Sequence, residues 1–286
     1  MRYLKDFTGE FIGTFIIVLF GCGSVAVTVL FSAHAGLYQV AMVWGLGVTL
    51  AIYASRQLSC AHLNPAVSIA MVITGRMPGA MLPCYLLAQF FGAFVAAGLL
   101  YLLFSSSIMQ YELTHEIVRG TQSSIASAMI FGEYYPNPMA GHIASVSTTN
   151  AFFAECIGTF ALVFMILALT ESCNSGRPDQ NLAPLFIGLT VAAIISVIAP
   201  LTQAGLNPAR DLSPRILAAL CGWSGAAFPD NHFGFITVYV AGPIAGGVLA
   251  ALSFKNIIEP LVNNTAAKGC KVDSAYSKTA MSEKQP

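Results

Sequence analysis

The chain has 286 residues, of which 56% are hydrophobic and only 9% are charged, and its 13 basic residues balance its 13 acidic ones. A soluble domain usually carries about a quarter charged residues, so this composition excludes an ordinary soluble protein and indicates one that lies mainly in lipid. The zero net charge also argues against nucleic acid as a partner.

The first apolar run covers about 7–31 and follows the basic residues Arg2 and Lys5. A positive start before an apolar run is also typical of a secretory signal peptide, but no convincing small-residue cleavage site follows, and the run continues to about Phe31. A retained first span is therefore predicted.

Six apolar runs are long enough to cross a membrane as helices, which takes roughly 20 mostly apolar residues. They cover about 7–31, 37–55, 83–104, 150–170, 182–200 and 233–254. With the N-terminus inside, ten Lys and Arg residues lie on the inner side and only Arg119, Arg210 and Arg215 lie outside. The positive-inside rule therefore predicts that both termini are cytoplasmic.

Two of the connections contain an apolar stretch that is too short to cross a bilayer. The segment 56–82 contains "CAHLNPAVSIAMVITG", and the segment 201–232 contains "QAGLNPARDLSPRILAALCG". Each stretch opens with Asn-Pro-Ala, in which Asn is a good helix N-cap and Pro suits the first helical position. Both segments are predicted to be half-helices that begin at Asn64 and Asn207 and re-enter the membrane.

An internal repeat relates the two halves of the chain. Asn64 and Asn207 are 143 residues apart, and the same offset aligns "GLGVTLAI" from Gly45 with "GLTVAAII" from Gly188. Two separate stretches that match at the same offset are stronger evidence for a repeat than a single match. The chain is therefore interpreted as two related halves.

Two further matches fall at slightly larger offsets. "EFIGTF" from Glu10 and "ECIGTF" from Glu155 lie 145 residues apart, and "QFFGA" from Gln89 resembles "PIAGG" from Pro243 at an offset of 154. Each half then has three spans and one half-helix, so the second half must insert upside down. Such an inverted-topology repeat places a solute path near the midplane, lined by discontinuous helices.

The two half-helices are expected to enter from opposite faces and meet with their N-termini at the centre. Irregular backbone at membrane depth is tolerated only where protein shields it or where it lines a wet cavity. The carbonyls before each Asn are predicted to form a ladder of acceptors beside an apolar wall, and they belong to Cys60, Ala61, His62, Gln203, Ala204 and Gly205. This arrangement predicts a pore.

Glu10 and Glu155 each place a carboxylate in an apolar span, which is costly and is usually retained for a reason. Snorkelling to the headgroups and a proton relay are alternatives. A third interpretation is favoured, in which each glutamate accepts hydrogen bonds from the backbone N–H groups of the re-entrant loop in its own half and turns the loop carbonyls toward the pore.

Paired Asn-Pro-Ala motifs on an inverted repeat, with Arg after the second, resemble the major intrinsic protein (aquaporin) family over about residues 5–256. The motif residues are Asn64, Pro65, Ala66, Asn207, Pro208 and Ala209. Several stretches resemble the glycerol-facilitator branch of that family. They are N-P-A-R-D, "WGLGV", "SCAHLNPAV", "APLT", and the "THEIVRG" and "YPNP" of the long connection 105–149.

The resemblance implies a homotetramer in which every subunit has its own pore for glycerol, related small polyols and water. Asn64 and Asn207, for which a helix-cap role alone is the alternative, would donate hydrogen bonds to the solute at mid-channel. Arg210 would form the selectivity filter rather than pair with Asp211 or a lipid headgroup, because its fork of donors suits two adjacent hydroxyls. Trp44 matches the aromatic wall of the filter, although membrane Trp residues are often interfacial.

The same resemblance assigns Ile195 and Ala204 to the filter and exposes two departures. The glycerol-facilitator branch usually has a small glycine where this chain has Ile195, and an aromatic residue where it has Ala204. Both residues would pass for ordinary packing elsewhere. A filter of comparable width and different shape is expected, and a mainly water-selective channel is the alternative function. Asp211 is interpreted as a second brace of the loop, facing away from the pore.

Facilitated diffusion without chemistry is the predicted mechanism. The half-helix N-termini each present about half a positive charge, so cations and protons are expected to be excluded. A coupled transporter would need an acid or histidine near mid-span, an enzyme would need a convergent nucleophile, base or metal set, and a purely structural protein would not need paired half-helices. No cofactor or metal site is predicted.

The predicted organisation is a channel domain over 1–262, with repeats over about 5–104 and 150–256 joined by the outer connection 105–149. The polar tail 263–286 is predicted to be a disordered cytoplasmic segment. The expected fold class is an all-α membrane protein, with six transmembrane helices and two re-entrant half-helices, in the plasma or inner membrane.

Overall fold

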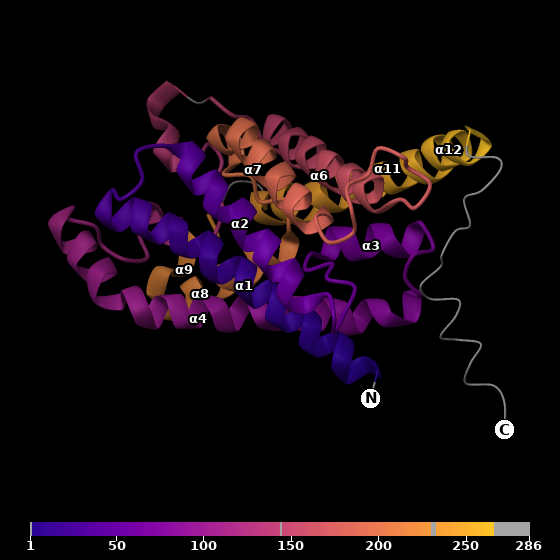
Figure 1. Ribbon diagram of the computed structural model, residues 1–286. Coiled ribbons are helices and arrows are strands. Elements are labelled where there is room, and N and C mark those ends of the chain that lie inside the picture. The colour runs from indigo at the N-terminus through magenta and orange to yellow at the C-terminus, as the bar shows by residue number, and fades with distance from the viewer. Residues whose placement is uncertain (1, 144, 230–232, 266–286) are drawn as a thin grey trace.

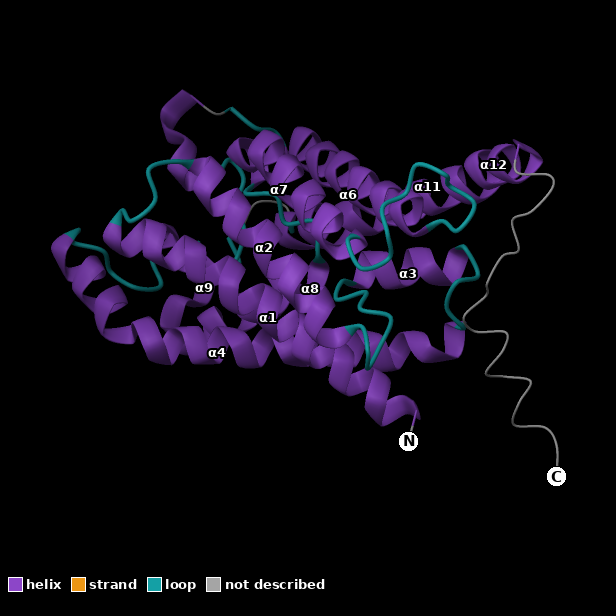
Figure 2. Cartoon of the chain, viewed as in Figure 1, coloured by secondary structure: helices purple, strands orange, loops and turns teal. Residues whose placement is uncertain are grey.

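The computed structural model describes residues 2–143, 145–229 and 233–265, and these residues form helices and connecting loops without strands (Figures 1 and 2). Six helical segments are long and apolar enough to cross a membrane, as predicted. Five of them are α1 (Arg2–Phe31), α2 (Leu37–Ser55), α4 (Leu82–Thr114), α6 (Thr148–Thr170) and α7 (Ala183–Thr202). The sixth is the segment Gly234–Val262, of which α11 (Gly242–Ser253) is the central part.

The half-helices are α3 (Pro65–Ile73) and α8 (Pro208–Ala218), and each begins directly after its asparagine. Short helices join or extend these elements: η1 (Gly79–Met81), η2 (Gln122–Ser124), α5 (Ile125–Ala128), η3 (Pro138–Ile143), η4 (Ala219–Trp223), α9 (Ser224–Ala227), α10 (Gly234–Ile236), η5 (Thr237–Ala241), η6 (Phe254–Ile258) and α12 (Glu259–Thr265). The all-helical membrane fold class is thereby confirmed.

Two element boundaries differ from those predicted. The third span was expected to end near residue 104, but α4 continues to Thr114. Residues 105–114 are polar enough to end an apolar run, yet Met, Gln, Glu and Leu among them are good helix formers, so the helix outlasts its hydrophobic part. At the other end of the channel domain, α12 extends to Thr265. The rest of the predicted tail, 266–286, lies outside the described residues.

The two halves pack in the same way. In the first half α1 contacts α4 and α2, and in the second half α6 contacts α11 and α7, while α2 and α7 pack on each other between the halves. Figure 1 shows α1 and α4 in the lower part of the molecule and α6, α7 and α11 in the upper part. The half-helices are exchanged, because α3 packs on α11 and α8 packs on α4. This exchange brings the starts of α3 and α8 to the boundary between the halves.

Glycines allow close contacts between the long helices, and they occupy equivalent positions in the two halves of the repeat. A Cβ on Gly92 of α4 would lie 2.4 Å from the carbonyl oxygen of Phe11, and a Cβ on Gly246 of α11 would lie 2.1 Å from that of Cys156. Gly92 and Gly246 are the fourth residues of the "QFFGA" and "PIAGG" segments. The repeat read from the sequence is therefore also a repeat of contacts.

Candidate functional site

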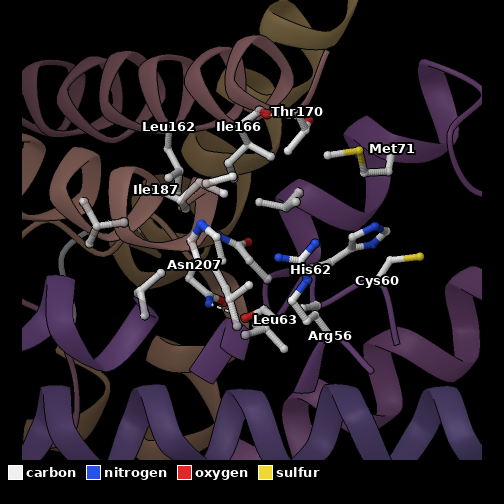
Figure 3. Close-up of a pocket in the computed structure, with 18 of the residues that line it drawn as sticks. Arg56, Cys60, His62, Leu63, Met71, Leu162, Ile166, Thr170, Ile187 and Asn207 are labelled. Atoms are coloured by element: carbon white, nitrogen blue, oxygen red, sulfur yellow. Dashed lines mark hydrogen bonds between the residues drawn. The ribbon is translucent and has the colours of Figure 1, made fainter. Parts of the chain in front are cut away.

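A cavity of about 640 Å³ runs between the two halves. At its mouth lie Arg56, Arg76 and Glu171, and its lining extends inward past both asparagines to Arg210 and Trp44. Figure 3 shows apolar Leu162, Ile166 and Ile187 together on one side and the sulfur-bearing Cys60 and Met71 on another. The cavity thus has a polar edge and an apolar wall.

The asparagines tie the two half-helices together. The side-chain oxygen of each accepts a hydrogen bond from the backbone N–H two residues further on, at 2.9 Å for Asn64 and 3.0 Å for Asn207. Each side-chain amide donates to the other half, Asn64 to the carbonyl of Leu206 at 2.9 Å and Asn207 to that of Leu63 at 2.8 Å. Both asparagines line the cavity, and each amide has a second hydrogen to offer a solute.

Glu10 is fully buried and holds the loop before α3. One carboxylate oxygen accepts hydrogen bonds from the hydroxyl of Ser59 at 2.8 Å and the backbone N–H of His62 at 2.9 Å. The other accepts from the backbone N–H of Leu63 at 2.7 Å and the side-chain amide of Gln89 at 2.8 Å. The burial leaves no room for snorkelling, and the four donors compensate the carboxylate for the loss of water.

Glu155 repeats this arrangement in the second half. It is fully buried, and it accepts from the hydroxyl of Thr202 at 2.6 Å, the backbone N–H of Gly205 at 2.8 Å and that of Leu206 at 2.6 Å. Both glutamates therefore make the contacts that the proposed bracing role requires.

The braced loops contain left-handed residues other than glycine. Ala61 and Leu63 have φ of 51° and 55°, and Ala204 and Leu206, their counterparts 143 residues later, have φ of 60° and 58°. Such residues cost on the order of 1–3 kcal/mol each unless surrounding structure holds them. The hydrogen bonds to the glutamates hold this backbone beside the cavity, which Ala61, Leu63, Ala204 and Leu206 line.

Arg210 and Trp44 lie together at the end of the cavity that is opposite its mouth. The guanidinium carbon of Arg210 is 4.2 Å from the centroid of the Trp44 ring, and its Nη2 donates to the carbonyl of Ala204 at 3.0 Å. Ile195 lines the same cavity. Gly21 on α1 makes room for the Trp44 ring, because a Cβ there would lie 2.2 Å from it. The structure thus brings together the four residues assigned to the filter.

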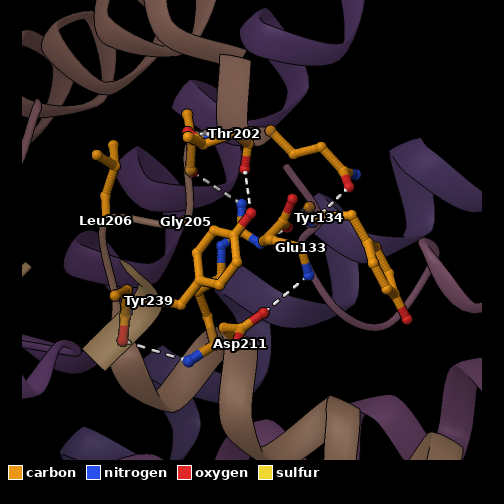
Figure 4. Close-up of polar contacts among 12 residues, drawn as sticks. Glu133, Tyr134, Thr202, Gly205, Leu206, Asp211 and Tyr239 are labelled. Atoms are coloured by element: carbon orange, nitrogen blue, oxygen red, sulfur yellow. Dashed lines mark hydrogen bonds and ion pairs between the residues drawn. The ribbon is translucent and has the colours of Figure 1, made fainter. Parts of the chain in front are cut away.

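A buried ion pair on α8 holds the connection between α5 and η3. Asp211 and Arg215 pair one helical turn apart at 2.7 Å, and both are about 1% exposed. Asp211 accepts the backbone N–H of Glu133 at 2.8 Å, and Arg215 donates to the carbonyl of the same residue. Figure 4 shows the Asp211 carboxylate directed at this backbone. Gly132 permits the approach, since a Cβ there would lie 2.9 Å from the guanidinium of Arg215.

Gln203 holds the connection between α5 and η3 with its side chain. It is not among the residues that line the cavity, and the pore-facing role of its carbonyl stays a prediction. Gln203 ends α7 in a left-handed conformation, and its side chain accepts the backbone N–H of Tyr134 at 2.8 Å. The Tyr134 hydroxyl in turn donates to the carbonyl of Ala226 at 2.8 Å. Burial raises the pKa of Tyr134 to about 12, so this phenol stays neutral as a donor.

The cavity mouth carries charges of both signs. Arg76 pairs with Glu171 and, at 3.0 Å, with Glu259 of α12. Its guanidinium also lies 5.4 Å from the centroid of the Phe254 ring. The end of the sixth span is thereby tied at the mouth to the turn that follows the half-helix α3.

The model of one protein family, described as the major intrinsic protein family, matches residues 1–254. The chain belongs to the major intrinsic protein family. The match covers both half-helices and every element that lines the cavity except α12, which contributes Glu259.

Relatives of this major intrinsic protein carry more specific names. The glycerol uptake facilitator protein of Pseudomonas aeruginosa is 41% identical over 90% of each chain, and that of Escherichia coli K12 is 40% identical over 87% of this chain and 86% of its own. The propanediol uptake facilitator of Citrobacter freundii is 37% identical over 94% and 96%. The aquaglyceroporin of Plasmodium falciparum has a similar solved structure, with a TM-score of 0.79, 29% identity and coverage of 92% and 99%.

Sequence reasoning missed several residues that hold the site of this major intrinsic protein. Ser59 and Thr202 lie 143 residues apart, the same offset as the two asparagines, and each donates its hydroxyl to the glutamate of its half. The repeat alignment could have identified them. Glu133 contacts Arg210, and no repeat or motif marks it, because the connection that carries it has no counterpart in the second half.

Proposed function

We propose that this chain is a passive membrane channel for glycerol and related small neutral polyols that also conducts water. The observation that supports it best is the reciprocal bonding of Asn64 and Asn207, which presents amide donors of both halves to one cavity. A hydroxylated solute can exchange its water contacts for those amides, for Arg210 and for loop carbonyls, while its carbon atoms pass along the apolar wall.

Ion exclusion follows from the same arrangement. The half-helices α3 and α8 both begin at the asparagines, so their N-terminal partial charges, about half a unit each, face the same point. A cation or proton at this point meets positive potential and finds few anionic partners to replace its hydration. The channel therefore selects neutral solutes.

Further parts of the proposal concern the setting of the channel. We place it as a homotetramer in the lipid bilayer of the plasma or inner membrane, with both termini cytoplasmic, as the distribution of Lys and Arg indicates. The pore roles of Asn64, Asn207, Trp44 and Arg210, and the bracing roles of the buried carboxylates, belong to the same proposal.

A mainly water-selective channel is the second candidate, and Ile195 favours it. This branched side chain lines the cavity at a level where the related facilitators usually have glycine. Ala204 compensates by being small, so the residual opening depends on both residues together.

The test is osmotic shock of liposomes that contain the purified protein. A sucrose gradient shrinks the vesicles at a rate set by water permeability, and a glycerol gradient adds a reswelling phase if glycerol enters. We expect reswelling with the unmodified chain. Shrinkage without reswelling would replace the polyol function by the water-selective alternative.

Two tryptophan substitutions on α7 form a matched pair that tests whether solutes pass through the cavity. Ile195→Trp adds an indole inside the cavity, and we expect it to reduce glycerol and water permeability at least tenfold. Val197→Trp places the same ring on the outer surface, where Val197 is 75% exposed, and we expect little change. Equal permeabilities in the two variants would show that solutes do not pass Ile195.

A further inference from the structure

Glu133 carries a buried carboxylate that no sequence motif marks. The residue lies in the connection between α5 and η3, it is 4% exposed, and its Oε1 forms an ion pair with Nη1 of Arg210. The backbone on both sides of its Cα is fixed, because its N–H donates to Asp211 and its carbonyl accepts from Arg215. The carboxylate is therefore held against Arg210 by two buried charged residues.

The hydrogen-bonding groups around Arg210 are unequally satisfied. Nη2 of Arg210 donates to the carbonyl of Ala204, so that carbonyl is already engaged. Oε2 of Glu133 is buried and has no hydrogen-bond partner among the described residues. A buried carboxylate oxygen without a donor is costly, and a donor that arrives with the permeating solute would satisfy it.

A polyol hydroxyl needs both kinds of partner at a narrow point. It accepts one hydrogen bond and donates another, whereas a guanidinium only donates. Arg210 lines the cavity, and Glu133 forms an ion pair with its guanidinium, so the pair offers a donor and an acceptor side by side. The pair is also neutral overall, which keeps the attraction for hydroxyls without the full field of an isolated arginine.

We propose that Glu133 is a specificity-determining residue of the channel, which neutralises Arg210 and accepts a hydrogen bond from a solute hydroxyl at the filter. This inference rests on the proposed polyol function and deepens it. Solutes with more hydroxyl groups gain more from the acceptor, so the channel ranks three-carbon solutes by their hydroxyls and not by size alone.

The experiment compares Glu133→Gln with the unmodified chain in liposomes, using water, glycerol and propane-1,2-diol. Glutamine keeps the shape of the side chain but removes the charge and turns one acceptor into a donor. We expect glycerol permeability to fall about tenfold, as the loss of a charged hydrogen bond suggests, propanediol permeability to fall less, and water permeability to change least.

Glu112→Gln is the matched control. Glu112 is also a buried glutamate, 7% exposed, and it pairs with Arg119 at 2.7 Å. Arg119 does not line the cavity, whereas Arg210, the partner of Glu133, does. We expect its solute ratios to equal those of the unmodified chain. Glu133→Asp keeps the charge and withdraws the oxygens by one methylene group, so an intermediate ratio is expected, and this variant also carries the test if Glu133→Gln fails to fold.

Two outcomes would overturn the inference and leave the polyol function intact. A parallel fall in all three permeabilities would make the pair a structural support only, and a parallel rise would make it a plug above the cavity. Failure of the polyol function appears differently, as the absence of glycerol reswelling in the unmodified chain.

Discussion

At the scale of single residues, the two loops beside the cavity depend on two glutamates that are buried and hydrogen-bonded. Glu10 receives four hydrogen bonds and Glu155 receives three. An isolated carboxylate in an apolar span is expensive, whereas these two exchange water for backbone and side-chain donors. The benefit is an irregular loop held in one conformation beside the cavity.

Removing the charge of Glu155 should therefore destabilise the protein. In Glu155→Gln the amide nitrogen must face either the N–H of Leu206 or the donors on the opposite oxygen, so at least one buried donor loses its partner. We expect a loss of about 1–3 kcal/mol in the free energy of unfolding, measured by thermal unfolding in detergent. Glu116→Gln, at an exposed position, should change stability by less than about 0.5 kcal/mol; equal effects would show that burial of Glu155 has no energetic consequence.

At the scale of elements, the two halves meet along α2 and α7. Among the described residues, no other pair of long helices from opposite halves packs together extensively. Gly45 and Gly188 make that contact, and they occupy equivalent positions of the repeat. A Cβ on Gly188 would lie 2.3 Å from the carbonyl oxygen of Gly45 and 2.1 Å from the hydroxyl of Thr49. The two helices can approach this closely only without side chains at the crossing.

A single methyl group at this crossing should push the halves apart. We expect Gly188→Ala to cost about 1–3 kcal/mol, as overpacking does, and to lower the melting temperature. Gly98→Ala on α4 is the control, because a Cβ there meets nothing within 4 Å. If both variants melt together, the close contact of α2 and α7 is not a determinant of stability.

At the scale of the whole molecule, the cavity lies between the two halves of a single chain. Both half-helices, both asparagines and the filter residues come from the same subunit. In the proposed tetramer each subunit should then conduct independently of its neighbours.

Mixed assemblies test this independence. Co-reconstituted unmodified and Ile195→Trp subunits should give a glycerol permeability that falls linearly with the fraction of blocked subunits. A steeper fall would indicate a path shared between subunits. The mass of the purified complex, expected near four times the 30.2 kDa of the chain, checks the assembly itself.

Hydropathy, the offset repeat and the Asn-Pro-Ala pair determined the six spans and the two half-helices from sequence alone, because these features depend on local composition and spacing. The same motifs carried the resemblance to the family. The tertiary structure decided the rest. The exchange of α3 and α8 between halves, the hydrogen bond of the Gln203 side chain with Tyr134 and the contact of Glu133 with Arg210 join residues distant in sequence. Glu133 and Arg210 are 77 positions apart, and only folding of the connection onto α8 brings their charges together.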